Sequence, residues 1–191
     1  MSLEGSLIMI TGAARSGKSY FAEQMAGSLG TKVTYIATCI PLGMEMEKRI
    51  ALHKIRRPDN WLTIEEPFDP VMAIKQNDGI GKVFLLDCLT LLISNWIFEC
   101  LPEKREEIVI NRIEQLAKAS REALATVIIV TNEVGWGIVP DNPLSRDYRD
   151  LVGRANQIVG VHANEVYISI AGIPIELKAL KKELAKPAIR Y

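Results

Sequence analysis

The chain has 191 residues, 48% of them hydrophobic, and its 23 Lys and Arg balance its 23 Asp and Glu. This length fits one domain over residues 1–191, and the composition is typical of a soluble globular protein. Neutral net charge gives no support to nucleic-acid binding or stable membrane insertion as the main task, although a local basic patch could still exist. Cys39, Cys88 and Cys100 share no CxxC spacing, which predicts neither a disulfide framework nor a zinc site. We therefore expect a cytoplasmic protein.

Short apolar runs alternate along the chain with longer stretches of helical periodicity. The runs are rich in β-branched or aromatic residues, and they predict strands at 6–11, 32–37, 82–87, 126–131 and 165–170. The intervening stretches predict helices at 18–29, 46–57, 89–100, 103–124 and 144–163. A further apolar run, with a turn at Gly172, and a last amphipathic helix follow. This alternation predicts an α/β fold with a mainly parallel sheet and helices on both faces.

Two irregular regions, 38–43 and 132–143, each begin at the carboxyl end of a predicted strand. Ligands of open α/β sheets bind at that edge. Both regions are therefore candidates for the walls of a binding site.

The stretch "GAARSGKS" fits the phosphate-loop pattern G-x-x-x-x-G-K-[ST] and lies between a predicted strand and a predicted helix. Its two glycines let successive backbone N–H groups point inward, and the following helix adds its positive end. The lysine can reach the β and γ phosphates, and the last serine can bind Mg²⁺. The sequence thus predicts a P-loop NTPase-like (RecA-like) fold in which the loop binds nucleotide through Gly12, Ala13, Ala14, Arg15, Ser16, Gly17, Lys18 and Ser19.

Acidic residues follow two of the predicted strands. P-loop enzymes hold Mg²⁺ partly through an acid at the end of a neighbouring strand. Asp87 ends the run "VFLLD", and Glu133 lies just beyond the run "VIIVT". Either residue could instead cap the segment that follows it.

His53 lies in "RIALHKIRRPDNW", beside Lys54, Arg56 and Arg57. By itself the histidine could be half-buried on an amphipathic helix, and the cations could form a solvated face. A nearby P-loop favours another reading, since neutral imidazole attacks phosphorus and cations stabilise the charge on the transferred group. The residues alone leave open whether the α or the γ phosphate is attacked. His162 has no such neighbours and is interpreted as structural.

Several motifs together resemble one enzyme family over essentially the whole chain. They are "ITGAARSGKSYFAE", "YIAT", "EMEKRIALHKIRRPDNWLTIEEP", "LLDCLT", "VTNEVGWGIVPDNPLSRDYRDLVGRANQ" and "EVYISIAGIPIELK". In this order and spacing they are similar to the bifunctional adenosylcobinamide kinases and adenosylcobinamide-phosphate guanylyltransferases of cobalamin biosynthesis.

The resemblance implies two successive transfers. A nucleoside triphosphate, ATP or GTP, phosphorylates the aminopropanol hydroxyl of adenosylcobinamide, and GMP then passes from GTP through His53 to the new phosphate. The P-loop pattern itself predicts a catalytic role for Lys18 and gives Ser19 and Asp87 as the candidate Mg²⁺ ligands. The nucleotide contacts that the resemblance implies beyond the phosphate loop are Thr38, Lys54, Ile55, Arg56, Arg57, Glu65 and Asp87. Family enzymes are propeller-like homotrimers, which implies the same assembly here.

A carboxylate can read guanine because it accepts from both N1–H and the exocyclic amine. Either Glu65 or Asp87 could do so, while the other serves Mg²⁺. The chain also departs from many relatives, since Gly43 and Met44 stand where those carry an acidic pair. This departure keeps open a guanylyltransferase whose kinase half is lost. A GTP-binding switch without transfer chemistry is a second alternative, of a different class.

Overall fold

The structure is a computed structural model, and it describes residues 5–30, 32–41, 43, 57–79 and 81–185. The strands of this part are β1 (Leu7–Gly12), β2 (Lys32–Ala37), β3 (Leu62–Glu65), β4 (Lys82–Asp87), β5 (Thr126–Val130), β6 (Glu165–Ile170) and β7 (Ile173–Glu176). Its α-helices are α1 (Lys18–Leu29), α3 (Pro70–Asn77), α4 (Leu89–Glu99), α5 (Arg105–Glu122), α6 (Pro143–His162) and α7 (Leu177–Leu184). Two 3₁₀ turns, η1 (Pro102–Lys104) and η2 (Val134–Trp136), complete these elements.

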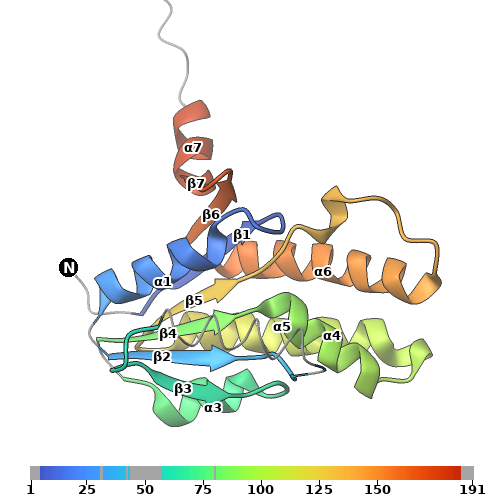
Figure 1. The fold of residues 1–191 in the computed structure, drawn as a ribbon, viewed down its shortest axis with the longest axis horizontal. Coiled ribbons are helices and arrows are strands. Elements are labelled where there is room, and N and C mark those ends of the chain that lie inside the picture. The colour runs from blue at the N-terminus through green and yellow to red at the C-terminus, as the bar shows by residue number, and fades with distance from the viewer. Residues whose placement is uncertain (1–4, 31, 42, 44–56, 80, 186–191) are drawn as a thin grey trace, which may run out of the picture.

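The described strands form one seven-stranded sheet in the order β3-β2-β4-β5-β1-β6-β7. Every neighbouring pair is parallel except β6 and β7, which form an antiparallel hairpin at one edge. Because β5 lies between β1 and β4, the carboxyl ends of these three strands meet side by side at one edge of the sheet (Figure 1). The predicted mainly parallel α/β fold is confirmed.

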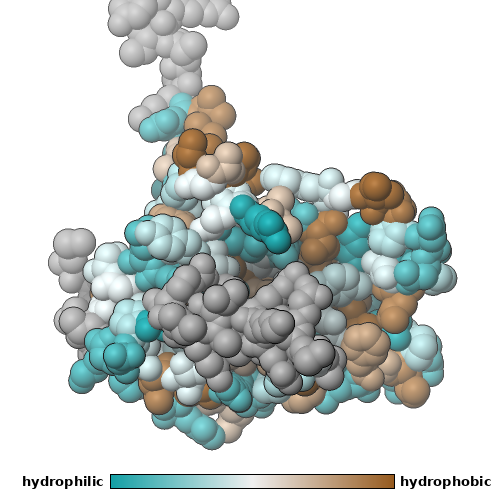
Figure 2. Space-filling view, viewed as in Figure 1, coloured by the Kyte–Doolittle hydropathy of each residue, from teal (hydrophilic) through white to brown (hydrophobic). Residues whose placement is uncertain are grey.

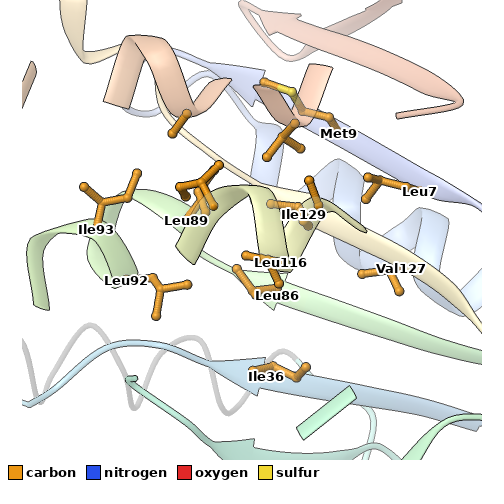
Figure 3. Packing of buried hydrophobic residues seen from close by; sticks show 14 of the residues in the cluster. Leu7, Met9, Ile36, Leu86, Leu89, Leu92, Ile93, Leu116, Val127 and Ile129 are labelled. Atoms are coloured by element: carbon orange, nitrogen blue, oxygen red, sulfur yellow. The ribbon is translucent and has the colours of Figure 1, made fainter. Parts of the chain in front are cut away.

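Alternating side chains of the strands enter two cores, one on each face of the sheet. From β1, Leu7 and Met9 pack under α3, α4, α5 and α6, as Figure 3 shows for part of this cluster. Ile8 and Ile10 point to the other face, where Ala22 of α1 is buried. Helices therefore lie on both faces, as predicted, and four of the described ones share the same face.

The region from 62 to 77 differs from the sequence prediction, which placed neither a strand nor a helix there. β3 is an edge strand of four residues with little burial, and α3 has only eight residues. Short apolar stretches of this kind carry too little periodicity to be detected. The predicted helix over 46–57 lies outside the described residues except for Arg57, which is in a bend. The predicted helix over 103–124 is shorter, because Pro102 opens a 3₁₀ turn before α5.

The described part of the chain ends in the turn at Gly172 and the amphipathic helix that the sequence predicts. Ala171 and Gly172 make the turn between β6 and β7 with positive φ values of 51° and 81°. In Figure 1, β7 and α7 extend beyond the layers formed by the other elements. In the described part of the chain, no helix is both long and apolar enough to cross a membrane.

Candidate active site

The phosphate loop connects β1 to α1, as the sequence predicts. Arg15 and Gly17 have positive φ values of 59° and 92°, which turn the backbone sharply before Lys18 opens the helix. No side chain caps that helix start, so its N–H groups are available to an anion. A Cβ at Gly12 would lie 2.5 Å from the carbonyl oxygen of Ser169 and 2.6 Å from Ser16 Oγ, which explains the glycine.

The β6–β7 hairpin holds the phosphate loop from outside. The carbonyl oxygen of Ser16 accepts a hydrogen bond from Ser169 Oγ at 2.7 Å and another from the Gly172 amide at 2.9 Å. Ser169 is buried. The two donors fix the Ser16 carbonyl on the hairpin side of the loop. Sequence reasoning missed this role of Ser169, since nothing along the chain connects it with residues 12–19.

Lys18 lies between the loop and the end of β4. Its Nζ donates to the carbonyl oxygen of Ala13 at 3.2 Å. Burial lowers the pKa of its ammonium group, while Cys88 and Asp87 oppose this by raising it. A bound phosphate would supply further negative charge at this position and favour the charged ammonium.

Asp87 is the carboxylate that ends β4, and Tyr35 of β2 orients it. The Tyr35 hydroxyl donates to Asp87 Oδ2 at 2.9 Å. Burial, and next the charge of Asp87, raise the pKa of Tyr35, so its hydroxyl stays a donor. On the other side, the guanidinium carbon of Arg57 lies 3.3 Å from the centroid of the Tyr35 ring. Tyr35 thus connects the predicted metal ligand to the last residue of the predicted basic run, a connection that the sequence did not reveal.

Thr38 follows β2 and is fully buried. Its hydroxyl donates to the carbonyl oxygen of Cys88 at 2.8 Å and accepts from the Cys88 amide at 2.9 Å. The Asn95 side chain donates to the Thr38 carbonyl oxygen at 2.9 Å. Thr38 therefore joins the ends of β2 and β4, directly beside the predicted nucleotide contacts.

Glu65 ends β3 at the same level of the sheet as Asp87, because Ala37 of β2 is in register with both residues. One strand separates them, which corresponds to roughly 10 Å between their backbones. Glu65 and Arg57 line one surface hollow of about 380 Å³, together with Trp61. The structure thus brings Glu65 and Arg57 together in one hollow and places Glu65 one strand away from Asp87.

Glu133 lies just beyond β5, between the phosphate loop and Asp87. Its Oε1 accepts from Thr11 Oγ1 at 2.6 Å and from Asn156 Nδ2 at 3.1 Å. Its backbone amide donates to the Gly12 carbonyl oxygen at 3.2 Å. The sequence left open that the Glu133 side chain caps the following segment, but it makes no capping hydrogen bond to η2 or α6.

Unpartnered polar atoms gather at this edge. Among the described residues, five buried side-chain nitrogen or oxygen atoms have no hydrogen-bond partner, and four of them belong to Ser16, Arg57 and Asn132. The fifth is Ser120 Oγ, in α5. Each buried polar group without a partner costs about 1–3 kcal/mol. Their position at the carboxyl edge indicates a polar ligand that would pair with them.

The oxygen atoms of Ser19 and Asp87 have the chemistry that Mg²⁺ requires. Mg²⁺ binds oxygen and usually keeps several waters and substrate phosphate oxygens rather than an all-protein cage. In the described part of the chain, no group of three or more His, Cys, Asp or Glu could hold a metal ion. Ser19 and Asp87 have the kind of oxygen atoms that Mg²⁺ binds together with substrate phosphates.

The remaining predicted residues are distributed as follows. Ala14 and Arg15 are exposed on the phosphate loop, and Ser19 is in the first turn of α1. His53, Lys54, Ile55 and Arg56 lie outside the described residues. His162 is at the end of α6, where Nε2 lies 3.7 Å from Glu114 Oε2.

The family comparison identifies the class of protein to which the chain belongs. Residues 8–177 match the family described as cobinamide kinase / cobinamide phosphate guanyltransferase. The chain belongs to this family. It is therefore an enzyme of the cobinamide kinase and guanyltransferase class, and the resemblance seen in the sequence is confirmed.

Individual relatives match over nearly their whole length. The bifunctional adenosylcobalamin biosynthesis protein CobU of Escherichia coli (strain K12) is 38% identical over 181 residues, covering 90% of this chain and 99% of its own. CobU of Salmonella typhimurium is 39% identical with the same coverage. CobP of Pseudomonas aeruginosa is 38% identical, covering 89% of this chain and 96% of its own. About nine tenths of the chain thus corresponds to nearly the full length of these bifunctional relatives.

Solved structures share the fold at low identity. A protein of Pyrococcus horikoshii OT3 gives a TM-score of 0.54 at 11% identity, covering 95% of this chain and 90% of that chain. The ATP synthase subunit NeqB of Nanoarcheaum equitans gives 0.51 at 14% identity, covering 96% of this chain and 49% of that chain. With the phosphate loop in place, the predicted P-loop NTPase-like fold is confirmed.

Proposed function

We propose that the chain catalyses two successive transfers to adenosylcobinamide. In the first, the aminopropanol hydroxyl oxygen bonds to the γ-phosphorus of a nucleoside triphosphate, ATP or GTP, and the nucleoside diphosphate leaves. In the second, His53 attacks the α-phosphorus of GTP and pyrophosphate leaves. The phosphate made in the first step then displaces His53 and gives adenosylcobinamide-GDP.

The single observation that carries this proposal is the common edge of the phosphate loop and the other predicted contacts. Thr38, Glu65 and Asp87 lie at the carboxyl ends of three different strands, on the same edge of the sheet as the phosphate loop. Arg57 lies in a bend before β3 and is held near this edge by the Tyr35 ring. The unpartnered side-chain atoms of Ser16 and Arg57 belong to the phosphate loop and to the residue beside Tyr35. Such an edge suits a nucleotide whose phosphates lie on the loop and whose base lies toward β3.

Within this proposal, each group has a definite task. The N–H groups of residues 12–19 and the Lys18 ammonium hold the phosphates. Ser19 and Asp87 would hold a Mg²⁺ ion, which supplies charge stabilisation on the phosphates when it is bound. Glu65, in the hollow with Trp61 and Arg57, is then the better placed carboxylate to read guanine. Lys54, Ile55 and Arg56 would continue the nucleotide contacts next to His53.

The assembly and location form part of the same proposal. The family resemblance supports a homotrimer. Cys39, Cys88 and Cys100 are free thiols, which suits a reducing cytoplasm.

Product analysis tests the proposal. The protein is incubated with adenosylcobinamide, Mg²⁺ and either GTP or ATP, and the products are identified by mass. We expect adenosylcobinamide phosphate with a suitable triphosphate and adenosylcobinamide-GDP only with GTP. Lys18→Ala should abolish both products, whereas Lys75→Ala, an exposed lysine on α3, should have no effect. Formation of neither product by the wild type would contradict the proposal. If adenosylcobinamide-GDP formed only when adenosylcobinamide phosphate was supplied, the chain would be a guanylyltransferase alone.

A further inference from the structure

Glu133 has one carboxylate oxygen engaged and one available. Oε1 accepts from Thr11 and Asn156, while Oε2 makes no hydrogen bond or ion pair within the described part of the chain. A carboxylate that only stabilised the fold would be expected to use both oxygens or to face solvent. Here the side chain is half-buried beside the first residue of the phosphate loop.

Buried polar contacts fix the direction of this carboxylate. Asn156 of α6 is buried, and its Oδ1 accepts from Thr131 Oγ1 at 2.7 Å. Its Nδ2 donates both to Glu133 Oε1 and to the Asn132 carbonyl oxygen, each at 3.1 Å. The chain of contacts from Thr131 through Asn156 holds Oε1 from the helix side, and Thr11 holds it from β1. Such a network gives a fixed position to the remaining oxygen.

The position of Glu133 matches the place of the phosphate acceptor. Adjacent strands put Glu133 about one strand spacing, roughly 5 Å, from both the phosphate loop and the Asp87 strand. The buried and unpartnered Asn132 Oδ1 lies next to it in the sequence. A hydroxyl group that approaches the γ-phosphate on the loop would therefore be within reach of the Glu133 carboxylate.

The segment after Glu133 offers an apolar surface for the rest of the acceptor. The side chains of Trp136, Ile138 and Val139 are 60%, 95% and 58% exposed. Figure 2 shows hydrophobic colour at the upper right, where the loop between β5 and α6 lies in Figure 1. A broad macrocycle can rest on such side chains while its hydroxyl-bearing arm points to Glu133.

We propose that Glu133 is the general base of the kinase step. Its Oε2 accepts the proton of the acceptor hydroxyl while that oxygen bonds to the γ-phosphorus and the bond to the bridging oxygen breaks. The nucleoside diphosphate leaves, and the proton passes later from Glu133 to solvent. This inference rests on the proposed function. It also gives the kinase step an acid–base residue that does not depend on the acidic pair replaced by Gly43 and Met44.

Glu133→Gln tests the inference because it keeps the shape and the Oε1 acceptor while removing the base. Transfer of γ-phosphate from GTP to adenosylcobinamide is measured in one assay, and labelling of the protein by α-labelled GTP without corrinoid in another. We expect kcat of phosphorylation to fall by about 10²-fold or more. Labelling should stay within about twofold of the wild type, since no corrinoid hydroxyl takes part in it.

Two further variants keep the test decisive. Thr11→Val removes one hydrogen bond to Oε1 and should slow phosphorylation by a smaller factor, about tenfold, without changing labelling. Glu99→Gln, which changes a surface ion pair on α4, should change neither assay. Phosphorylation by Glu133→Gln at the wild-type rate would overturn the inference, as would an equal loss of both activities. Absence of phosphorylation by the wild type itself would instead contradict the proposed function.

Discussion

The arrangement around Asp87 shows how one side chain can organise several parts of a site. Tyr35 donates to Asp87 Oδ2 and carries the Arg57 guanidinium on its ring. The hydroxyl engages Oδ2 of the Asp87 carboxylate and so fixes the orientation of that group. The aromatic ring shields part of a cation whose Nε and Nη1 are buried without partners. Tyr35 therefore positions both the Asp87 carboxylate and the Arg57 guanidinium.

Tyr35→Phe separates these two roles, since it removes the hydroxyl and keeps the ring. We expect about a tenfold fall in kcat of phosphorylation, because Asp87 loses the donor that orients it. KM for the nucleotide should change less, because Arg57 keeps its aromatic partner. Tyr167→Phe is the matched control, since its hydroxyl bonds to Glu165 on β6. Equal effects of the two substitutions in steady-state kinetics would contradict this role.

Cys88 gives a prediction that depends on pH. Burial, and next the charge of Asp87, raise the pKa of the Cys88 thiol from 9.0 to about 11. Near pH 8, about one thiol in a thousand is then ionised, so alkylation should be slow. Cys88 also favours the folded state below about pH 9, and this contribution is lost as the pH rises through about 11. Peptide mapping after iodoacetamide treatment should show Cys100 modified before Cys88, and the reverse order would contradict the assignment.

At the scale of elements, the antiparallel β6–β7 hairpin shows how a neighbouring element supports a phosphate loop. A strand, a glycine-rich turn and a helix are enough to predict the loop from sequence, because its glycines and lysine are local signals. The groups that hold the loop are distant in sequence, since Ser169 and Gly172 of the β6–β7 hairpin donate to the Ser16 carbonyl oxygen.

Ser169→Ala tests this support. One of the two donors to the Ser16 carbonyl is lost, and the Gly172 amide remains. The free energy of unfolding should fall by about 1 kcal/mol, which corresponds to roughly 2–4 °C in Tm for a chain of this size. KM for the nucleotide should rise severalfold, because the loop is less well fixed. Ser28→Ala, on the exposed side of α1, is the control, and equal kinetics for the two variants would contradict the role of Ser169.

The same scale explains what could be predicted and what could not. Buried strands such as β4 and β5 were predictable because they are continuous apolar runs between turns, and Asp87 followed from the end of one. β3 and α3 were missed because four mostly exposed residues and an eight-residue helix leave little pattern. Tyr35 and Asn156 were missed for another reason. Their roles depend on contacts between strands and helices that sequence spacing does not encode.

At the scale of the whole molecule, the seven-stranded sheet joins both cores. Strands β1, β4 and β5 contribute side chains to the cores on both faces of the sheet. Loss of packing in one core therefore affects the other. The nucleotide edge includes residues from most of the length of the chain. We propose that residues 1–191 form one folding unit, and that nucleotide binding stabilises it as a whole.

Urea unfolding tests this proposal. Circular dichroism and tryptophan fluorescence should report one coincident transition, because Trp61 and Trp96 belong to different cores of the same sheet. GTP with Mg²⁺ at about 100 times its Kd should add about 2.7 kcal/mol to the free energy of unfolding. Two separate transitions would contradict a single unit, and Lys18→Ala should lose the nucleotide effect.

The most direct test of the central claim is covalent labelling with GTP that carries the label at the α-phosphate. The wild-type protein is incubated with this GTP and Mg²⁺, denatured and separated from free nucleotide, and the same is done with His53→Ala and Lys18→Ala. We expect label on the wild type that acid releases and base does not, and none on either variant. An unlabelled wild type, or label that persists in His53→Ala, would contradict a guanylylated histidine at this P-loop site.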